Sequence, residues 1–209
     1  MNTRYMKATG LVMLMSLGLS ACAPVMLAGF AGTAMVASDR RTSGTQLEDE
    51  TIELRGSARI RDALGERAHV NITSYNRQVL LSGEVATERD KQIVEGLLEK
   101  LENVKSVVNE LSIMQPTSLS SRSNDLLLSA KVKASLVDSR DLFANAFKVV
   151  VERGTVYVMG RVTQREATSA TNVIRNVNGV NKVVRLFDII SEEELRNLLP
   201  PPPADKAQK

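Results

Sequence analysis

The same run of residues occurs twice in this sequence, and the repeat restricts the chain to folds built from two copies of one unit. The segment VLLSGEV at 79–85 matches VYVMGRV at 156–162, 77 positions later. A second pair, NVKSVVNEL at 103–111 and GVNKVVRLF at 179–187, is 76 positions apart. Self-similarity of this kind indicates a duplicated supersecondary unit. A chain of 209 residues has room for two small domains.

Each copy is predicted to contain a helix, two strands, a second helix and a third strand, with the third strands over 104–113 and 180–190. In the first copy, Val70 and Ile72 alternate with polar residues, which is the period of a half-buried strand. Turn residues follow the first strand of both copies: Asn76-Arg77 and Arg153-Gly154. A capping residue with an acid three positions later begins each second helix: Thr87 with Asp90, and Thr163 with Glu166. We therefore expect an α+β fold of two tandem αββαβ units, each with a small three-stranded mixed sheet packed against two helices.

These patterns set the expected boundaries along the chain. The two domains occupy 51–113 and 124–190, and a polar linker at 114–123 joins them. Residues 191–209 are expected to form a short helix and a disordered proline-rich tail. Before the first domain, a stretch rich in glycine, alanine and serine predicts a flexible tether within 22–50.

The N-terminus has the pattern of a secretory signal peptide. Residues 1–9 carry Arg4 and Lys7 but no acid, and the uncharged apolar run that follows ends at Cys22. The four residues LSAC that end this run resemble the bacterial lipobox. That resemblance implies a lipoprotein signal peptide over 1–21 and a diacylated cysteine as the mature N-terminus.

Two other interpretations of this region stay open. The uncharged run over 10–37 is long enough to span a bilayer as one helix, although Pro24, Gly29 and Gly32 make its second half a poor helix. Cys22 could also be a structural or reactive thiol, but the chain has no second cysteine with which to form a disulfide. We expect Cys22 to be a lipid anchor, because several acyl chains together hold a protein stably on a membrane.

The two copies resemble the BON domain, an αββαβ module. The likeness is carried by the glycine of the second strand, in LSGEV and VMGRV, and by the terminal GVNKVV. With the lipobox and the segment DRRTSGTQLEDETIELR, the chain is similar to the dual-BON-domain outer-membrane lipoproteins from residue 19 to about residue 190. That resemblance implies a non-enzymatic protein, lipid-anchored in the outer membrane and facing the periplasm, which binds anionic phospholipid (phosphatidylglycerol or cardiolipin) through its second domain and supports envelope integrity. Ala23, rather than aspartate, follows the cysteine, and by the same resemblance this favours the outer membrane.

The sequence offers little for catalysis. Its single histidine, His69, falls on the strand phase opposite Val70 and Ile72, so we expect a solvated strand residue. No cluster of histidine, cysteine and acidic residues has metal-ligand spacing, and no nucleophile has a base beside it in sequence. We expect no cofactor, no metal and no catalytic residues; an enzyme that depends on His69 is the distant alternative. The formal charge of +3 includes Arg4 and Lys7 of the signal peptide, so it gives no reason to expect nucleic-acid binding.

The first helix of the second copy, over 124–139, has two apolar faces, whereas a helix that covers a small sheet needs only one. One face carries the residues expected in the core: Leu128, Val132 and Leu136. At 100° per residue, a second face carries a further apolar set: Leu126, Leu127, Ala130, Ala134 and Val137. The first copy has charged residues, Arg55 and Asp62, at two positions that match this second face. Something other than the core of the second domain should therefore cover it.

Basic residues border this second face. Lys131 and Lys133 flank it, and the longer loop of the second copy adds Leu142 and Phe143. The second copy has ten basic and six acidic residues, whereas the first has nine and ten. An apolar surface bordered by cations suits an anionic bilayer. By resemblance this helix is the family's lipid-contact element, with leucine in place of the usual aromatic residue at Leu127. The expected phospholipid contacts are Leu126, Leu127, Ala130, Lys131, Lys133, Ala134, Val137 and Phe143.

A different occupant of the second face stays open. The face could pack against the first copy or against a second molecule. The protein would then be an interaction scaffold in the periplasm, with the outer-membrane protein assembly machinery or regulators of peptidoglycan amidases as partners.

Gly83 and Gly160 occupy the same position in the second strand of each copy. A glycine inside a strand often marks a close approach of another part of the chain. We expect both to be structural, because a side chain at either position would crowd the helix that faces the sheet.

Overall fold

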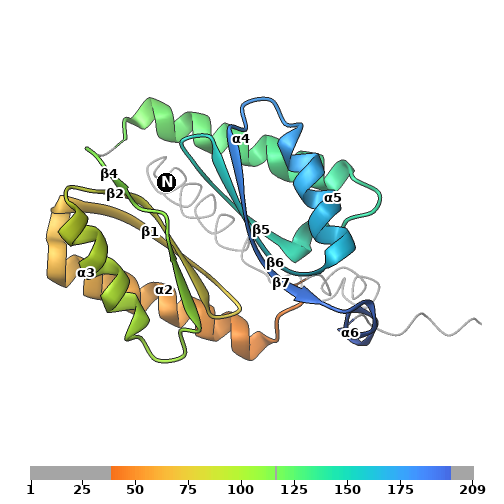
Figure 1. Cartoon of the computed structure of the whole chain (residues 1–209), viewed down its shortest axis with the longest axis horizontal. Helices are drawn as coiled ribbons and strands as arrows, with labels where there is room; N and C mark the ends of the chain where they lie inside the picture. Colours follow the sequence, from red (N-terminus) through yellow and green to blue (C-terminus); the bar gives the residue numbers. More distant parts are fainter. Residues whose placement is uncertain (1–38, 116, 199–209) are drawn as a thin grey trace, which may run out of the picture. The chain divides into compact units, whose positions relative to one another are not determined.

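The computed structural model describes residues 39–115 and 117–198 (Figure 1). The predicted signal peptide, Cys22 and the proline-rich tail lie outside the described residues. The described residues belong to one compact unit, in which each repeat builds its own sheet and its own aliphatic core.

The first repeat folds as a helix, a hairpin, a second helix and an interrupted third strand. Its elements are α2 (Ser43–Leu64), η1 (Gly65–Arg67), β1 (Ala68–Tyr75), β2 (Gln78–Val85), α3 (Glu88–Glu99), β3 (Ser106–Asn109) and β4 (Ser112–Ile113). β1 pairs antiparallel with β2, and β3 and β4 both run parallel to β2. The third strand was expected to be continuous over 104–113. It is interrupted where Leu111 is buried in the core, and the N–H of Leu111 is bound by the side chain of Asn109 instead of by β2.

The second repeat has the same order with an unbroken third strand. Its elements are α4 (Leu119–Asp138), η2 (Ala144–Ala146), β5 (Phe147–Glu152), β6 (Thr155–Thr163), α5 (Gln164–Arg175), β7 (Lys182–Ile190) and α6 (Glu192–Leu198). β6 is the central strand, antiparallel to β5 and parallel to β7. The predicted α+β fold of two tandem αββαβ units is therefore confirmed.

The predicted turns and caps have the geometry that their residues favour. The hairpin turn of the first repeat has φ values of 51° at Asn76 and 65° at Arg77, as a tight two-residue turn requires. Thr163 and Glu166 form a capping box at the start of α5: each side chain accepts the backbone N–H of the other residue. The box satisfies two backbone donors that the first turn of a helix leaves without partners.

Both first helices begin earlier than the sequence predicts. α2 begins at Ser43, where the flexible tether was expected, and α4 begins at Leu119, inside the expected linker. Thr42 and Ser118 are the N-caps, and each hydroxyl accepts a backbone N–H three residues later. Neither cap has an acid at the third position or an apolar residue in the core just after it. The signals that marked the later helices are absent here, and the boundaries were therefore wrong.

The two sheets bury their second faces against each other. Side chains that point away from the helices form a third apolar cluster: Tyr75, Leu80, Tyr157, Met159 and Leu186. Leu80 and Met159 are 0% exposed, although they lie on the strand phase that faces away from each domain's own core. The strands were expected to be half-buried, with the outer phase in water. The expectation is wrong for the outer phase, because the outer face of each sheet is covered by the outer face of the other.

Candidate functional site

α4 turns one face to the core of the second repeat and another to solvent. Leu128, Val132 and Leu136 are 7%, 0% and 1% exposed and belong to the core, which confirms the predicted core face. The other predicted face is exposed along its length: Leu126 72%, Leu127 61% and Val137 67%, with Ala130 and Ala134 also exposed.

The exposed apolar surface extends beyond the predicted set. Leu119, 81% exposed, lies seven residues or about two helical turns before Leu126, and so it falls on the same side of α4. It was missed because the expected linker covered this turn of helix. At 1.5 Å per residue, the distance from Leu119 to Val137 is about 27 Å. We refer to this surface as the α4 stripe: Leu119, Leu126, Leu127, Ala130, Ala134 and Val137.

No described residue of the first repeat covers the α4 stripe. The large exposed fractions of Leu126 and Leu127 are measured with both repeats in place. The alternative in which this face packs against the first repeat is therefore wrong. Packing against a second molecule stays a prediction.

Cations and one aromatic residue lie beside the α4 stripe. Lys131, Lys133 and Arg140 are exposed, and Phe143 is 58% exposed in the loop after the helix. Leu142 was expected to join this surface, but it is 8% exposed and packs in the core of the second repeat. The loop therefore contributes only one of its two large apolar side chains.

The equivalent face of α2 is mixed, where the sequence suggested a polar one. Arg55 and Asp62 are exposed as expected. Leu47 and Leu54 are also exposed, at 65% and 74%, and they match Leu119 and Leu126 by the spacing of the repeat. Charged residues interrupt the apolar surface of α2, whereas the apolar face of α4 is unbroken over 126–137, and the exposed Ser123 separates it from Leu119.

The two strand glycines are close to backbone, but not to the helices. A Cβ at Gly83 would lie 2.1 Å from the carbonyl oxygen of His69 on β1, and φ at Gly83 is +109°. A Cβ at Gly160 would lie 2.5 Å from the carbonyl oxygen of Ala146 in η2. The structural role is as expected, but the crowding comes from the chain segment beside each strand. The expected clash with the facing helix is wrong.

A buried acid joins the two repeats through an arginine. Glu84 on β2 has a side chain that is 0% exposed; His69 Nδ1 lies 3.1 Å from its Oε2, and Arg153 Nη1 lies 2.8 Å from its Oε1. Arg153 comes from the β5–β6 turn of the second repeat, and Thr117 also donates to Glu84. His69 was expected to be solvated, but its side chain is 32% exposed and takes part in this cluster. The expectation fails because β1 and β2 bury their outer face.

Each hairpin turn is held by an aspartate of the preceding helix. Asp125 of α4 accepts the two backbone N–H groups of 153–154 at 2.9 and 3.0 Å. Asp49 of α2 accepts those of 76–77, both at 2.8 Å. The two aspartates are 76 positions apart, whereas Leu47 and Leu119 of the same helices were matched at 72 positions. The pair was missed because that spacing does not bring the aspartates together and because Asp49 lay outside the expected boundary of the first domain.

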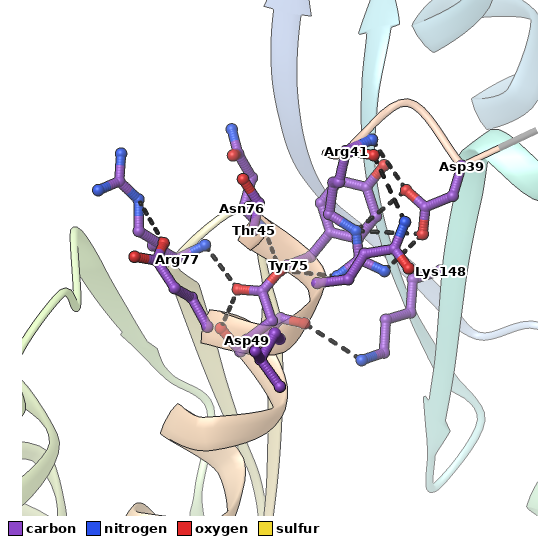
Figure 2. A network of polar contacts seen from close by, with 12 residues as sticks. Asp39, Arg41, Thr45, Asp49, Tyr75, Asn76, Arg77 and Lys148 are labelled. Carbon is purple, nitrogen blue, oxygen red and sulfur yellow. Dashed lines mark hydrogen bonds and ion pairs between the residues drawn. The ribbon is translucent and has the colours of Figure 1, made fainter. Parts of the chain in front are cut away.

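Arg41 ties the start of the described chain to the first repeat (Figure 2). Its Nη1 lies 2.7 Å from Asp49 Oδ2, and its Nη2 lies 2.6 Å from Asp39 Oδ2. The guanidinium carbon lies 4.3 Å from the centroid of the Tyr75 ring, within cation–π range. Residues 39–41 are thus part of the folded unit, where the sequence predicted tether.

The pKa values of Glu84 and Glu152, two neighbouring buried acids, are shifted in opposite directions. Burial raises the pKa of Glu152, and the nearby charge of Glu84 raises that pKa further. Burial also acts to raise the pKa of Glu84, but hydrogen bonds from Thr117 and the positive charges of His69 and Arg153 outweigh it. The pKa of Glu84 therefore lies below the ordinary value of 4.5.

We expect stability to pass through a maximum at mildly acidic pH. Because the pKa of Glu152 is higher in the folded state, the free energy of unfolding should rise as pH falls from 7 through that value. Below about 4.5, the unfolded chain binds protons that folded Glu84 and Glu166 do not, so stability should then fall. Urea midpoints measured from pH 7 to 3 test this. Glu152→Gln should abolish the initial rise; a steady decline from pH 7 in both proteins would contradict the assignment.

Within residues 39–115 and 117–198, every helix is too short or too polar to cross a bilayer. No three histidine, cysteine or acidic side chains in this part of the chain are grouped so that they could hold a metal ion.

Comparison with known proteins identifies relatives over most of the chain. The BON domain family profile matches residues 49–115 and 124–191. Outer membrane lipoprotein DolP of Haemophilus influenzae is 35% identical over 171 residues, which cover 81% of this chain and 89% of that protein. The 21 kDa hemolysin of Actinobacillus pleuropneumoniae is 32% identical over 154 residues, or 73% and 79% of the two chains. CdsD, a structural protein of the Chlamydia trachomatis type III secretion system, aligns with 66% of this chain and 94% of its own at 18% identity, but its TM-score of 0.29 is too low to support any conclusion.

Proposed function

This chain belongs to the BON family as a dual-domain protein of the DolP type, and from that membership we propose that it docks on anionic phospholipid through the α4 stripe. It is an outer-membrane lipoprotein of this family. In the proposal, Cys22 carries the lipid anchor, the folded unit faces the periplasm, and the second domain binds phosphatidylglycerol or cardiolipin. Lipid docking in turn supports the integrity of the envelope.

The exposure of the apolar side chains of the α4 stripe carries this proposal. A set of exposed apolar side chains that extends over about 27 Å of one helix is unusual for a surface that faces only water. Leu126, Leu127 and Val137 are each more than 60% exposed, and they lie on a helix whose opposite face is anchored in the core. Such a helix can place its apolar face at the headgroup boundary without losing its own packing.

The neighbouring charges favour an anionic surface. Lys131 and Lys133 lie on α4 itself, and Arg140 follows it. A cation near an anionic bilayer contributes about 1 kcal/mol, and this attraction weakens as salt screens it. Binding should therefore be stronger to phosphatidylglycerol than to phosphatidylcholine, and it should weaken at high salt.

Leu127→Glu is expected to reduce binding to phosphatidylglycerol vesicles by at least about tenfold, because it places a carboxylate against the anionic surface. Leu127 is 61% exposed, so the melting temperature should change little. Co-flotation of residues 23–209 with phosphatidylglycerol or phosphatidylcholine vesicles, at low and high salt, measures the effect.

Leu54→Glu is the matched control. It adds the same charge to the first helix of the first repeat, at a leucine that is 74% exposed, and binding should be unchanged. Equal losses in the two variants would mean that net charge, not the α4 stripe, governs binding. Absence of binding by the wild-type protein would leave the stripe as a protein contact, and a large stability loss in Leu127→Glu would point to packing against a second molecule.

A further inference from the structure

Residues 39–41, which we call the strap, precede the first domain in sequence but contact both domains. Arg40 is 8% exposed, and its guanidinium forms two bonds with the Glu166 carboxylate at 2.7 and 2.8 Å. Arg40 Nη1 also donates to the carbonyl oxygen of Arg161 at 3.0 Å. Glu166 belongs to the capping box of α5, so the strap is attached to a fixed point of the second domain. Arg41 meanwhile pairs with Asp49 of the first domain.

Asp39, the first residue of the strap, lies beside the C-terminal part of α4. Asp39 lines a cavity of about 440 Å³ together with Lys133 and Val137 of α4 and Phe147 of β5. Val137 belongs to the α4 stripe and Lys133 lies beside it, and both are in the last two turns of α4. The chain therefore enters the folded unit beside the C-terminal end of the α4 stripe.

We propose that Arg40 and Glu166 form a positioning latch that brings the anchor-bearing segment to the folded unit beside the α4 stripe, so that the anchor and the stripe engage the same membrane surface. The inference rests on the proposed function. If the latch were absent, the first fixed point of the chain would be Arg41, which pairs with Asp49 of the first domain. With the latch closed, it is Arg40, which is held by Glu166 of the second domain.

The latch would raise the effective concentration of the α4 stripe at the membrane surface that holds the anchor. Sixteen residues separate Cys22 from Asp39, and a chain of that length spans at most about 58 Å when fully extended. When one contact is already made, a second contact on the same molecule is favoured in proportion to how close the tether holds it to its target. A tether that ends beside the α4 stripe needs to span the least distance. Neither Arg40 nor Glu166 contacts lipid in this arrangement; each acts by placing the chain.

The variant that tests the latch removes both charges together: Arg40→Ala with Glu166→Gln. A buried ion pair that loses one partner leaves an uncompensated charge, whereas loss of both charges avoids that penalty. Glutamine at the third helical position also serves in a capping box, so α5 should keep its cap. Trypsin cleavage after Arg41 measures opening of the strap. In the wild-type protein Arg40 is 8% exposed, so cleavage there should be slow. In the variant it should be at least about tenfold faster.

Lipid engagement is measured with a polarity-sensitive fluorophore at Ala134→Cys, a small exposed position of the stripe. The sole native cysteine, Cys22, is blocked when lipidated and absent from residues 23–209. The lipidated full chains are reconstituted in phosphatidylcholine vesicles that contain increasing fractions of phosphatidylglycerol. Insertion of the α4 stripe should need a several-fold larger fraction of phosphatidylglycerol when the latch is open. A flexible 20-residue insertion before Asp39, with the latch intact, should reduce engagement by about threefold. The unlipidated proteins should bind vesicles equally with the latch open or closed.

The results separate the latch from the proposed function. Equal phosphatidylglycerol requirements of the two lipidated proteins would overturn the latch, while binding by the unlipidated chain would still support the proposed function. Unchanged trypsin cleavage would also overturn the latch, because the strap would be held by something else. If the unlipidated wild-type protein binds no phosphatidylglycerol, the proposed function fails and the latch falls with it. A loss of unlipidated binding in the latch variant would mean that the pair supports the fold of the lipid surface rather than the path of the chain.

Discussion

Gly83→Ala is expected to lower the free energy of unfolding by at least about 3 kcal/mol, and the melting temperature by roughly 10 °C or more. Two costs add at this position. The φ of +109° disfavours any residue with a Cβ, and the Cβ would lie 2.1 Å from the carbonyl oxygen of His69. That oxygen belongs to the strand paired with β2, so relief would require the β1–β2 ladder to open. Thermal and urea unfolding of the purified variant measure the effect.

Gly96→Ala is the control for this substitution. Gly96 lies in α3, where nothing is within 4 Å of the added methyl group, so alanine should stabilise the helix by about 0.5–1 kcal/mol. Gly160→Ala should fall between the two, because its Cβ would lie 2.5 Å from a carbonyl oxygen without the left-handed backbone. A Gly83→Ala protein as stable as the Gly96→Ala protein would show that β1 and β2 can separate at little cost.

The elements that sequence predicts well are those whose signal lies within one segment of chain. The capping box at Thr163 and Glu166 is such a case, since the two residues are three positions apart and specify one local geometry. The turn at Asn76 and Arg77 is another. The repeat adds confirmation, because each local pattern occurs twice.

The strap and the sheet-to-sheet contact could not be predicted because they depend on residues far apart in sequence. Arg40 meets Glu166 across 126 positions, and nothing near Arg40 distinguishes it from a solvated arginine of a tether. Leu80 and Met159 lie on the outer phase of their strands, and only the opposing sheet makes them buried. Binary patterning identifies a domain's own core, whereas burial between domains is a tertiary property.

The α4 stripe lies between these two cases. Leu127 and Val137 were identified by helical periodicity together with the charged counterparts in the first repeat. Leu119 was missed because the helix boundary was placed too late, and Leu142 was included although the loop folds it into the core. Periodicity identifies side chains within a helix reliably, but it gives no information on how a loop turns after the helix ends.

Arg153→Asn is expected to destabilise the protein by about 2–4 kcal/mol, because it leaves Glu84 buried without its arginine. The Glu84 side chain is 0% exposed, whereas that of Arg153 is 25% exposed. Asparagine is chosen because Arg153 has a φ of 49°, a value that asparagine tolerates well, so the β5–β6 turn should keep its backbone. Urea unfolding at pH 7 measures the loss, and circular dichroism checks that the fold is retained.

A double-mutant cycle with Glu84→Gln tests whether the loss comes from the uncompensated charge. Glu84→Gln alone should cost less than Arg153→Asn, since the freed guanidinium can be solvated and the amide can still accept from Thr117. The double variant should recover about 1–2 kcal/mol relative to the sum of the two single losses. If the losses simply add, Arg153 stabilises the contact between the two repeats through packing and through its hydrogen bond to Ser112. The Glu84 carboxylate would then be stabilised by its contacts with His69 and Thr117. A non-additive result would make the pair an electrostatic link between the two repeats, placed at the one position of β2 whose counterpart in β6, Arg161, has the opposite charge.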